Sequence, residues 1–409
     1  MKRGVFALIL ICAAAAAQTK ETPWLQWGGP NRNFQTEAAG LADHWPAAGP
    51  RVLWKRTLGE GYSSILVENG VLYTMYGRPG EEITLAAGAA TGKTIWERAN
   101  PVHFRNDAQD RGNGPHATPL IVDDRLFTTG VTGRLECLDK KTGKLLWTHS
   151  LWDELKGSRL IYGYAASPLP YRDLVLLPVG GPGNAMAAFR QTDGAVVWKK
   201  DTAGNAYSSP LLINVDGVDQ VVQLMAASVF AVNPLNGDLA WYVKHDEPYG
   251  LNVSMPVWGS GNLLFVATGY GAGSRAIEVK RSGDSVSAKE LWYSNRFGIH
   301  HGNAIRLSDT LYFSSGNGPA PFTAVDVRTG KVLWQNREFP KVTMVYADGK
   351  LIVLDEDGNL ALAQVSRQGV KTLAKAPLLA NNAWTPPTLV GTKLYVRDRR
   401  SMTAVELGR

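Results

Sequence analysis

Residues 137–147 read CLDKKTGKLLW, an apolar start followed by a charged glycine turn and a tryptophan. Turns of this kind recur along the chain, and neighbouring tryptophans at their ends lie 42 to 51 residues apart. A period of about 40–50 residues, with short apolar strands between glycine turns, is typical of β-propeller blades. The recurring positions are Trp54, Trp96, Trp147, Trp198, Trp241, Trp292 and Trp334.

The complete repeat at 116–147 contains four strand-like stretches, HATPLIV, RLFTTG, RLECLD and KLLWTHS. Their alternation and their β-branched and aromatic residues favour strands over helices. We therefore predict an all-β fold, an eight-bladed β-propeller of four-stranded antiparallel blades. The other units begin at Tyr62, Ala165, Tyr207, Val253, His301, Lys341 and Trp384.

The two ends of the repeat array are complementary. The last unit stops after three strands, and a tryptophan-bearing strand at 51–58 precedes the first complete blade. We expect this N-terminal strand to pair with 403–407 and close the ring, which removes an exposed sheet edge. Seven blades is the alternative, but it requires discarding the unit at 341–365, whose DG turns and alternating strands favour keeping it.

The first residues predict a secretory signal peptide at 1–17. Lys2 and Arg3 form its positive start, 5–11 its apolar centre, and three alanines at 15–17 its exit. Such a signal predicts a periplasmic or secreted protein. No later stretch approaches the ~20 apolar residues of a membrane-spanning helix, so no membrane span is expected.

The rest of the chain divides into a lead-in segment, 18–50, and a single propeller domain, 51–409. The formal net charge of +7 is spread thinly, with no run of five like charges. A nucleic-acid-binding surface would be clustered, so we expect no nucleic-acid partner. We expect the protein to act as a monomer.

The repeated tryptophans are interpreted as structural. A tryptophan can bury ~150–250 Å² and lock one blade against the next. Trp147 ends the most regular repeat, so we expect its side chain to be deeply packed.

Residues 137–147 and 324–334, AVDVRTGKVLW, resemble the quinoprotein-type (PQQ-like) propeller repeat, whose core is A-x-D-x-x-T-G-K-x-x-W. Residues 188–198 match it more loosely, and the opening WLQWGGPNRNF at 24–34 resembles the start of many secreted members. The family includes quinone-dependent dehydrogenases and the BamB-type propellers that help assemble outer-membrane barrels. The resemblance therefore implies the fold and leaves the activity open.

The sequence lacks several features that the dehydrogenases of this family carry. It has no adjacent cysteine pair and no C-x-x-C-H motif. The acidic stretch at 355–360 is interpreted as a strand turn rather than a calcium loop. His300 and His301 are adjacent, so on a strand they would point to opposite faces, and we predict no metal site. Catalytic residues stay unknown, and no cofactor is expected.

Candidate ligand-binding residues precede the inner strands. Equivalent positions in successive blades share the ring axis, so these residues should surround one mouth of the central channel. We expect five of them to converge on a common concavity, with the other four on its rim. The first group is Tyr62, His116, Tyr207, His301 and Trp384, and the rim group is Tyr164, Asn252, His300 and Lys341.

The leading hypothesis is a non-catalytic binding or scaffold module that holds a protein segment or a small polar ligand at this mouth. The alternative is a minimal PQQ-dependent dehydrogenase that oxidises an alcohol or a sugar with PQQ and calcium.

Overall fold

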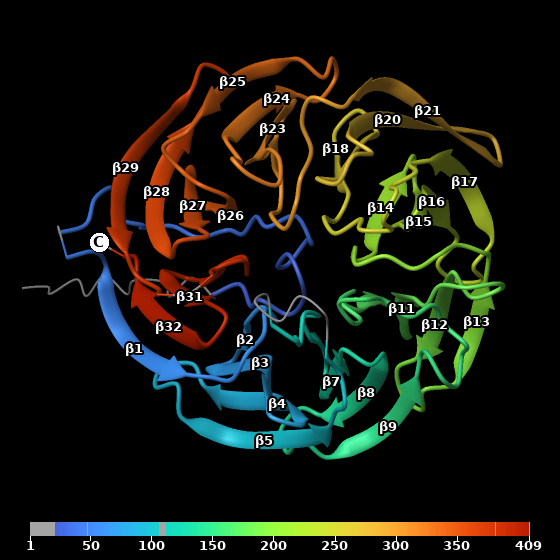
Figure 1. Ribbon diagram of the computed structural model, residues 1–409, viewed down its shortest axis with the longest axis horizontal. Helices are drawn as coiled ribbons and strands as arrows, with labels where there is room; N and C mark the ends of the chain where they lie inside the picture. Colours follow the sequence, from blue (N-terminus) through green and yellow to red (C-terminus); the bar gives the residue numbers. More distant parts are fainter. Residues whose placement is uncertain (1–20, 47, 106–111, 381, 409) are drawn as a thin grey trace, which may run out of the picture.

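The computed structural model describes residues 21–46, 48–105, 112–380 and 382–408. The predicted signal peptide lies outside these residues. The described chain forms eight four-stranded antiparallel sheets arranged around a central axis (Figure 1). This confirms the predicted all-β, eight-bladed propeller. Within the described residues there is no helix long and apolar enough to cross a membrane.

In each of the first four blades the strands pair in chain order from the axis outward. Blade 1 contains β2 (Leu66–Glu68), β3 (Val71–Arg78), β4 (Glu81–Gly88) and β5 (Thr94–Pro101). Blade 2 contains β6 (Leu120–Val122), β7 (Arg125–Thr129), β8 (Arg134–Asp139) and β9 (Leu145–Ser150). Blade 3 contains β10 (Leu169–Tyr171), β11 (Leu174–Pro178), β12 (Met186–Arg190) and β13 (Val196–Lys200), and blade 4 contains β14 (Leu211–Val215), β15 (Val218–Leu224), β16 (Ser228–Val232) and β17 (Leu239–Lys244).

The remaining blades follow the same order, except that the last borrows its outer strand from the N-terminal part of the chain. Blade 5 contains β18 (Val257–Gly259), β19 (Leu263–Ala267), β20 (Ser274–Ser282) and β21 (Ser285–Ser294). Blade 6 contains β22 (Ile305–Leu307), β23 (Thr310–Ser314), β24 (Phe322–Asp326) and β25 (Val332–Asn336). Blade 7 contains β26 (Val342–Ala347), β27 (Lys350–Asp355), β28 (Asn359–Val365) and β29 (Val370–Pro377), and blade 8 contains β30 (Thr388–Val390), β31 (Lys393–Arg397), β32 (Ser401–Glu406) and β1 (Arg51–Thr57).

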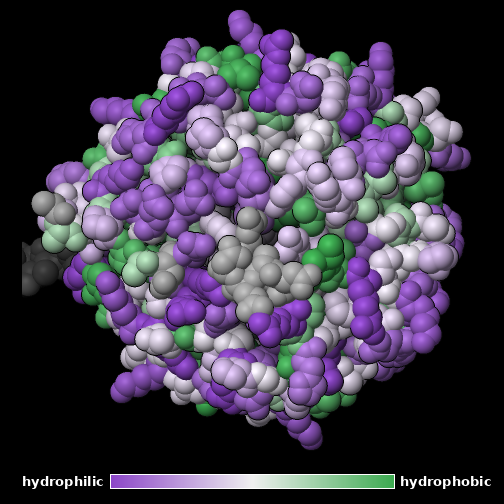
Figure 2. All heavy atoms as spheres, in the orientation of Figure 1, coloured by the Kyte–Doolittle hydropathy of each residue, from purple (hydrophilic) through white to green (hydrophobic). Residues whose placement is uncertain are grey.

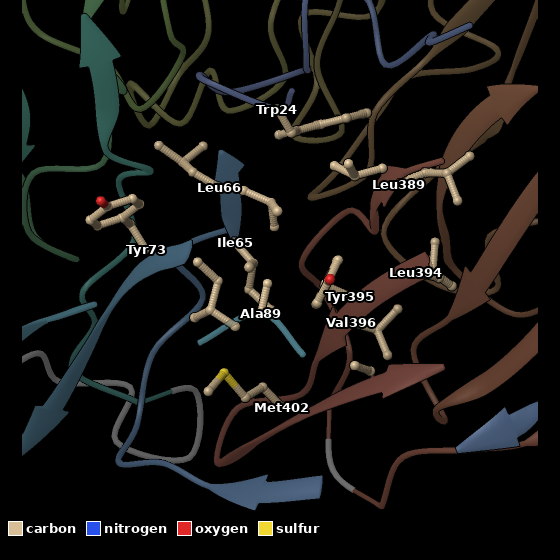
Figure 3. Close-up of a cluster of buried hydrophobic side chains, with 14 of the residues drawn as sticks. Trp24, Ile65, Leu66, Tyr73, Ala89, Leu389, Leu394, Tyr395, Val396 and Met402 are labelled. Atoms are coloured by element: carbon tan, nitrogen blue, oxygen red, sulfur yellow. The ribbon is translucent and has the colours of Figure 1, made fainter. Parts of the chain in front are cut away.

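The ring closes as predicted from the sequence. Strand β1 pairs antiparallel with β32, from Arg51 opposite Glu406 to Thr57 opposite Ser401. Blades 1 and 8 share one apolar core at this junction, and Figure 3 shows Trp24 lying beside their side chains. Closure therefore rests on both strand pairing and apolar burial.

A buried arginine adds polar bonds to the same junction. Arg397 of β31 is fully buried, and its Nη1 donates to the backbone oxygens of Ser63 at 2.9 Å and Met75 at 2.7 Å. These bonds join blade 8 to blade 1. Burial lowers the pKa of Arg397 to about 10, although the charge of Asp398 opposes this shift.

At most joints of the ring, the repeated tryptophan of one blade contacts the next blade. The Trp147 ring of blade 2 lies under Gly194 in the glycine turn of blade 3, and its Nε1 donates to the Gln191 backbone oxygen at 3.0 Å. We call this contact the tryptophan latch. Gly194 has a φ of +76°, and an added Cβ would lie 2.7 Å from the Trp147 ring. The same pairing recurs for Trp54 with Gly92, Trp96 with Gly143, Trp198 with Gly237 and Trp292 with Gly330.

The structural interpretation of the tryptophans holds, but the expectation that the Trp147 side chain is deeply buried is wrong. Trp147 is only partly buried, whereas Trp198 and Trp241 are 7% and 5% exposed. The latch places one ring face on a glycine turn at the outer strand, and the other face is covered only where a neighbouring side chain reaches it.

The latch predicts that Gly194→Ala is destabilising for two separable reasons. An alanine at a positive φ costs roughly 1–2 kcal/mol, and collision with Trp147 adds a further cost, so we expect a total of about 3 kcal/mol. Gly349→Ala is the matched control, because Gly349 has a φ of +70° but no atom within 4 Å of an added Cβ. Urea unfolding measures both variants, and equal losses would contradict the latch.

The lead-in segment crosses the ring at the end of the inner strands opposite the predicted mouth. Trp24 forms a bridge with Val67 of blade 1, and Gln35 forms one with Tyr346 of blade 7. The backbone oxygen of Leu25 accepts from the Ile121 N–H of blade 2 at 2.8 Å. Figure 1 shows this blue segment running from the rim toward the centre of the ring.

Candidate functional site

A cavity of about 300 Å³ lies inside the ring, between the predicted mouth and the lead-in segment. Residues at the start of the inner strands line it, and in blade 5 the consecutive residues 253–258 do so. In blade 4 they include Tyr207, Ser209 and Leu211, and in blade 6 they include His301 and Asn303. The lead-in segment forms the floor through Trp27, Asn31, Arg32, Asn33 and Phe34.

Hydroxyl groups near the mouth join neighbouring inner strands. The Ser64 N–H donates to Thr118 Oγ1 at 3.0 Å, and the Thr118 N–H donates to Ser167 Oγ at 2.9 Å. The Ser167 N–H in turn donates to Ser209 Oγ at 2.9 Å. Each of these residues lies two positions after the first residue of its repeat unit. The bonds satisfy backbone groups that are buried between blades, and so they fix the cavity wall.

Five predicted mouth residues converge on this cavity. Tyr62 stacks between His116 and Trp384, at centroid distances of 5.9 Å and 5.3 Å. Trp384 also contacts His301 at 4.8 Å, which extends the aromatic arc from blade 2 through blades 1 and 8 to blade 6. Tyr207 lines the cavity beside Tyr162, 6.0 Å away. All five residues line the same cavity.

Tyr164 and Asn252 do not lie on the rim, so their expected positions are wrong. Tyr164 is fully buried in the core, where its hydroxyl donates to the Pro178 backbone oxygen at 2.7 Å. Asn252 is also fully buried, and its Nδ2 donates to the Met225 backbone oxygen at 2.7 Å. Each directly precedes a cavity-facing position, so its side chain turns away from the axis into the blade.

Lys341 and His300 also depart from the expected rim. Lys341 is 7% exposed, with its Nζ 3.6 Å from Glu356 Oε2 and 5.5 Å from the centre of the Trp384 ring. Glu356 thus offsets the charge of Lys341. His300 is 2% exposed and contacts Tyr270.

The two adjacent histidines do not point to opposite faces. Their ring centroids lie 3.6 Å apart, because the chain bends here instead of continuing as a strand. The described residues contain no group of three His, Cys, Asp or Glu side chains that could hold a metal ion.

Burial shifts the pKa values of two residues at the mouth. Burial lowers the pKa of His116 to about 4, although a hydrogen bond to the Tyr162 backbone opposes this shift. His116 Nε2 is enclosed and has no hydrogen-bond partner among the described residues. Burial also raises the pKa of Tyr207 to about 12. At neutral pH, therefore, His116 and Tyr207 present uncharged rings to the cavity.

The depressed pKa of His116 predicts a pH-dependent stability. Between its ordinary pKa of 6.5 and the folded value of about 4, the unfolded chain binds more protons, so stability falls as the pH drops through this window. From pH 7 to pH 5 we expect His116→Gln to lose about 1–2 kcal/mol less than the unsubstituted protein in urea unfolding. His245, whose pKa burial lowers to about 3, contributes to both proteins. Parallel losses would contradict the assignment to His116.

The most important residue that sequence reasoning missed is Arg32. Arg32 lines the cavity floor, and the residue is 3% exposed. The stretch WGGPNRNF carried a usable signal, because aromatic, arginine and asparagine residues are concentrated ahead of the first blade. This stretch does not repeat, so the blade alignment could not place it.

The cavity lining is a poor match for the calcium of a PQQ site. Among the described residues that line it, Asn31, Asn33 and Asn303 supply amide oxygens and none supplies a carboxylate. Calcium sites in proteins rely on carboxylates. The aromatic arc would stack a planar group, but the donor set does not suit the metal that the dehydrogenase hypothesis needs.

The face seen in Figure 2 is predominantly hydrophilic, with hydrophobic residues in scattered patches. Contiguous apolar patches are the usual sign of a docking surface. The visible face therefore gives no stronger candidate site than the central cavity.

Comparison with known proteins gives one family match. Residues 79–336 match the family model described as outer membrane protein assembly factor BamB. The BamB of Shewanella oneidensis is 23% identical over 299 residues, covering 69% of this chain and 71% of that protein. The crystal structure of BamB from Moraxella catarrhalis aligns with a TM-score of 0.63 at 16% identity, over 88% of this chain and 100% of that one. This structural likeness shows the fold alone.

A dehydrogenase also matches, over a shorter length. The quinoprotein alcohol dehydrogenase PedH of Pseudomonas putida is 29% identical over 151 residues, which cover 34% of this chain and 25% of that enzyme. The match therefore spans a minor part of either protein.

Proposed function

Because this chain belongs to the family of the outer membrane protein assembly factor BamB, whose model matches more than half of it, we propose that it is a non-catalytic binding module. It works in the periplasm or outside the cell and acts through its ring rather than through a reaction. Its partner is a protein segment or a small polar ligand.

The binding site in this proposal is the central cavity. The observation that carries it is the convergence of Tyr62, His116, Tyr207, His301 and Trp384 on one concavity of about 300 Å³. That volume is at the lower end of the range for ligand pockets. Uncharged aromatic faces would stack an aromatic group or a flat polar group, and the rigid inner strands would hold those faces in position.

A neutral aromatic probe tests the site. We expect 3-phenyl-1-propanol to bind the protein in calorimetry, and Trp384→Ala or Tyr62→Ala to weaken binding about tenfold, as loss of a main stacking face should. Tyr242→Ala is the control, because Tyr242 is 55% exposed on β17, away from the cavity. Equal affinity in all four proteins would overturn the assignment of the site.

The dehydrogenase alternative is tested on the same protein. Reconstitution with PQQ and calcium should give neither the quinone absorbance of a bound cofactor nor dye-linked oxidation of alcohols or sugars. Micromolar or tighter PQQ binding that is lost in His116→Ala or Trp384→Ala would instead favour an enzyme.

A further inference from the structure

The cavity floor contains a buried positive charge that the propeller repeat does not supply. Arg32 comes from the lead-in segment, and its Nη1 donates to the Pro168 backbone oxygen at 2.9 Å and to Gln26 Oε1 at 3.3 Å. Its Nη2 donates to the Ser167 backbone oxygen at 3.3 Å. All three acceptors are neutral, so these bonds position the guanidinium without neutralising it.

No carboxylate among the described residues pairs with Arg32. Its Nε is buried without an acceptor in that part of the chain, and the three bonds use three of the five N–H groups of a guanidinium. Burial alone lowers its pKa to about 9, and the group therefore keeps its charge at neutral pH. A buried charge without a counterion is costly, and proteins ordinarily pair it.

The wall above this charge is largely apolar. Leu211, Met255, Val257 and Trp258 line the cavity on the side of blades 4 and 5, and Trp27 lies at the floor. Lys341, the cation among the predicted mouth residues, already has Glu356 beside it. The space therefore combines one uncompensated positive charge at its base with apolar and aromatic sides.

We propose that the ligand of this cavity is a small organic monocarboxylate with an aromatic or branched aliphatic body. Its carboxylate lies toward Arg32, where a planar guanidinium favours a planar anion, and its body covers the apolar wall below the aromatic arc. This inference rests on the proposed function, because it specifies the ligand class of the same cavity. An inorganic anion would satisfy the charge but leave the wall uncovered.

A matched pair of probes tests the charge separately from the cavity. 3-Phenylpropionate and 3-phenyl-1-propanol share an aromatic body and differ in the carboxylate. We expect the unsubstituted protein to bind the acid at least about tenfold more tightly than the alcohol in calorimetry, in line with a charge-assisted hydrogen bond in a buried site. Inorganic phosphate should bind far more weakly than the acid.

Two arginine substitutions test whether Arg32 causes the preference for the acid over the alcohol. Arg32→Gln should remove the preference for the acid while leaving affinity for the alcohol within about twofold, as expected when only the charge-assisted bond is lost. Arg159→Gln is the control, because Arg159 is exposed and pairs with Asp153. If Arg32→Gln does not fold, Arg32→Lys supplies the comparison, since it keeps the charge and loses the planar fork, and should reduce the preference.

Failure of the carboxylate inference and failure of the proposed cavity site would give different results. Equal affinity of the unsubstituted protein for acid and alcohol overturns the carboxylate inference and leaves the proposed cavity site standing. Phosphate binding as tight as that of the acid also overturns it, because the wall would then play no part. Absence of binding by both aromatic probes overturns the cavity site itself.

Discussion

Removal of residues 18–58 is expected to abolish the single cooperative unfolding transition of this protein. The deletion takes away β1, which completes blade 8, and Trp24, which is 1% exposed in the core shared by blades 1 and 8. It leaves β32 as an open edge, and exposed edges invite association. We expect a broad, low-amplitude transition in calorimetry and oligomers in size-exclusion chromatography.

A shorter deletion separates the two contributions. Removal of residues 18–36 takes away the cavity floor but keeps β1, so the ring should still close and unfold cooperatively at a lower temperature. A protein without 18–58 that melts as sharply, and at the same temperature, as the full ring would contradict closure by β1.

Replacement of Trp198 by alanine should cost about 3–5 kcal/mol of unfolding free energy, the range for emptying a buried aromatic site. Trp198 is 7% exposed, its ring lies on Gly237 of blade 4, and its Nε1 donates to the Pro234 backbone oxygen at 3.0 Å. The variant therefore loses a buried ring and leaves a carbonyl without its donor.

Trp334→Ala is the matched comparison in denaturant unfolding. Trp334 holds the same register, and its Nε1 donates to the Ser366 backbone oxygen at 2.9 Å, but its ring is less buried. We expect about half the loss of Trp198→Ala, since less apolar surface returns to water. Equal losses would mean that the hydrogen bond rather than burial governs the latch.

The blades could be predicted because their signal repeats. Most of the glycine turns and tryptophans correspond to a contact between neighbouring blades, and the missing fourth strand of the last unit indicated β1 as its partner. The burial of each tryptophan side chain could not be predicted in this way, because it depends on side chains of another blade. Trp147 and Trp198 share a motif yet differ in burial.

Residues of the candidate site could be predicted only where they follow the two-residue alternation of the inner strands. Tyr62, His116 and Trp384 keep the register of the inner strands and meet at the mouth. His300 lies on a bend, where alternation no longer applies. Arg32 belongs to a segment outside the repeat, and its place under the ring depends on long-range contacts that no local pattern encodes.

The joints between blades are not all held in the same way. Trp241 Nε1 bonds to Gln220 Oε1 of its own blade at 2.7 Å, while Trp241 belongs to an apolar core that includes Leu264 and Ile277 of blade 5. Between blades 7 and 8, where β29 has Ala374 opposite Leu362, the lead-in segment bridges the joint, bonding to Asp348 through Leu41 and to Leu407 through Ala42.

The joint between blades 4 and 5 is instead held by this shared apolar core and by side-chain bonds, among them Arg275 Nε to His245 Nδ1 at 3.0 Å and Asn262 Nδ2 to Asp216 Oδ1 at 3.1 Å. Successive blades of this propeller are therefore held together in three different ways: by an indole bond to the next blade, by a core shared across the joint, or by the lead-in segment.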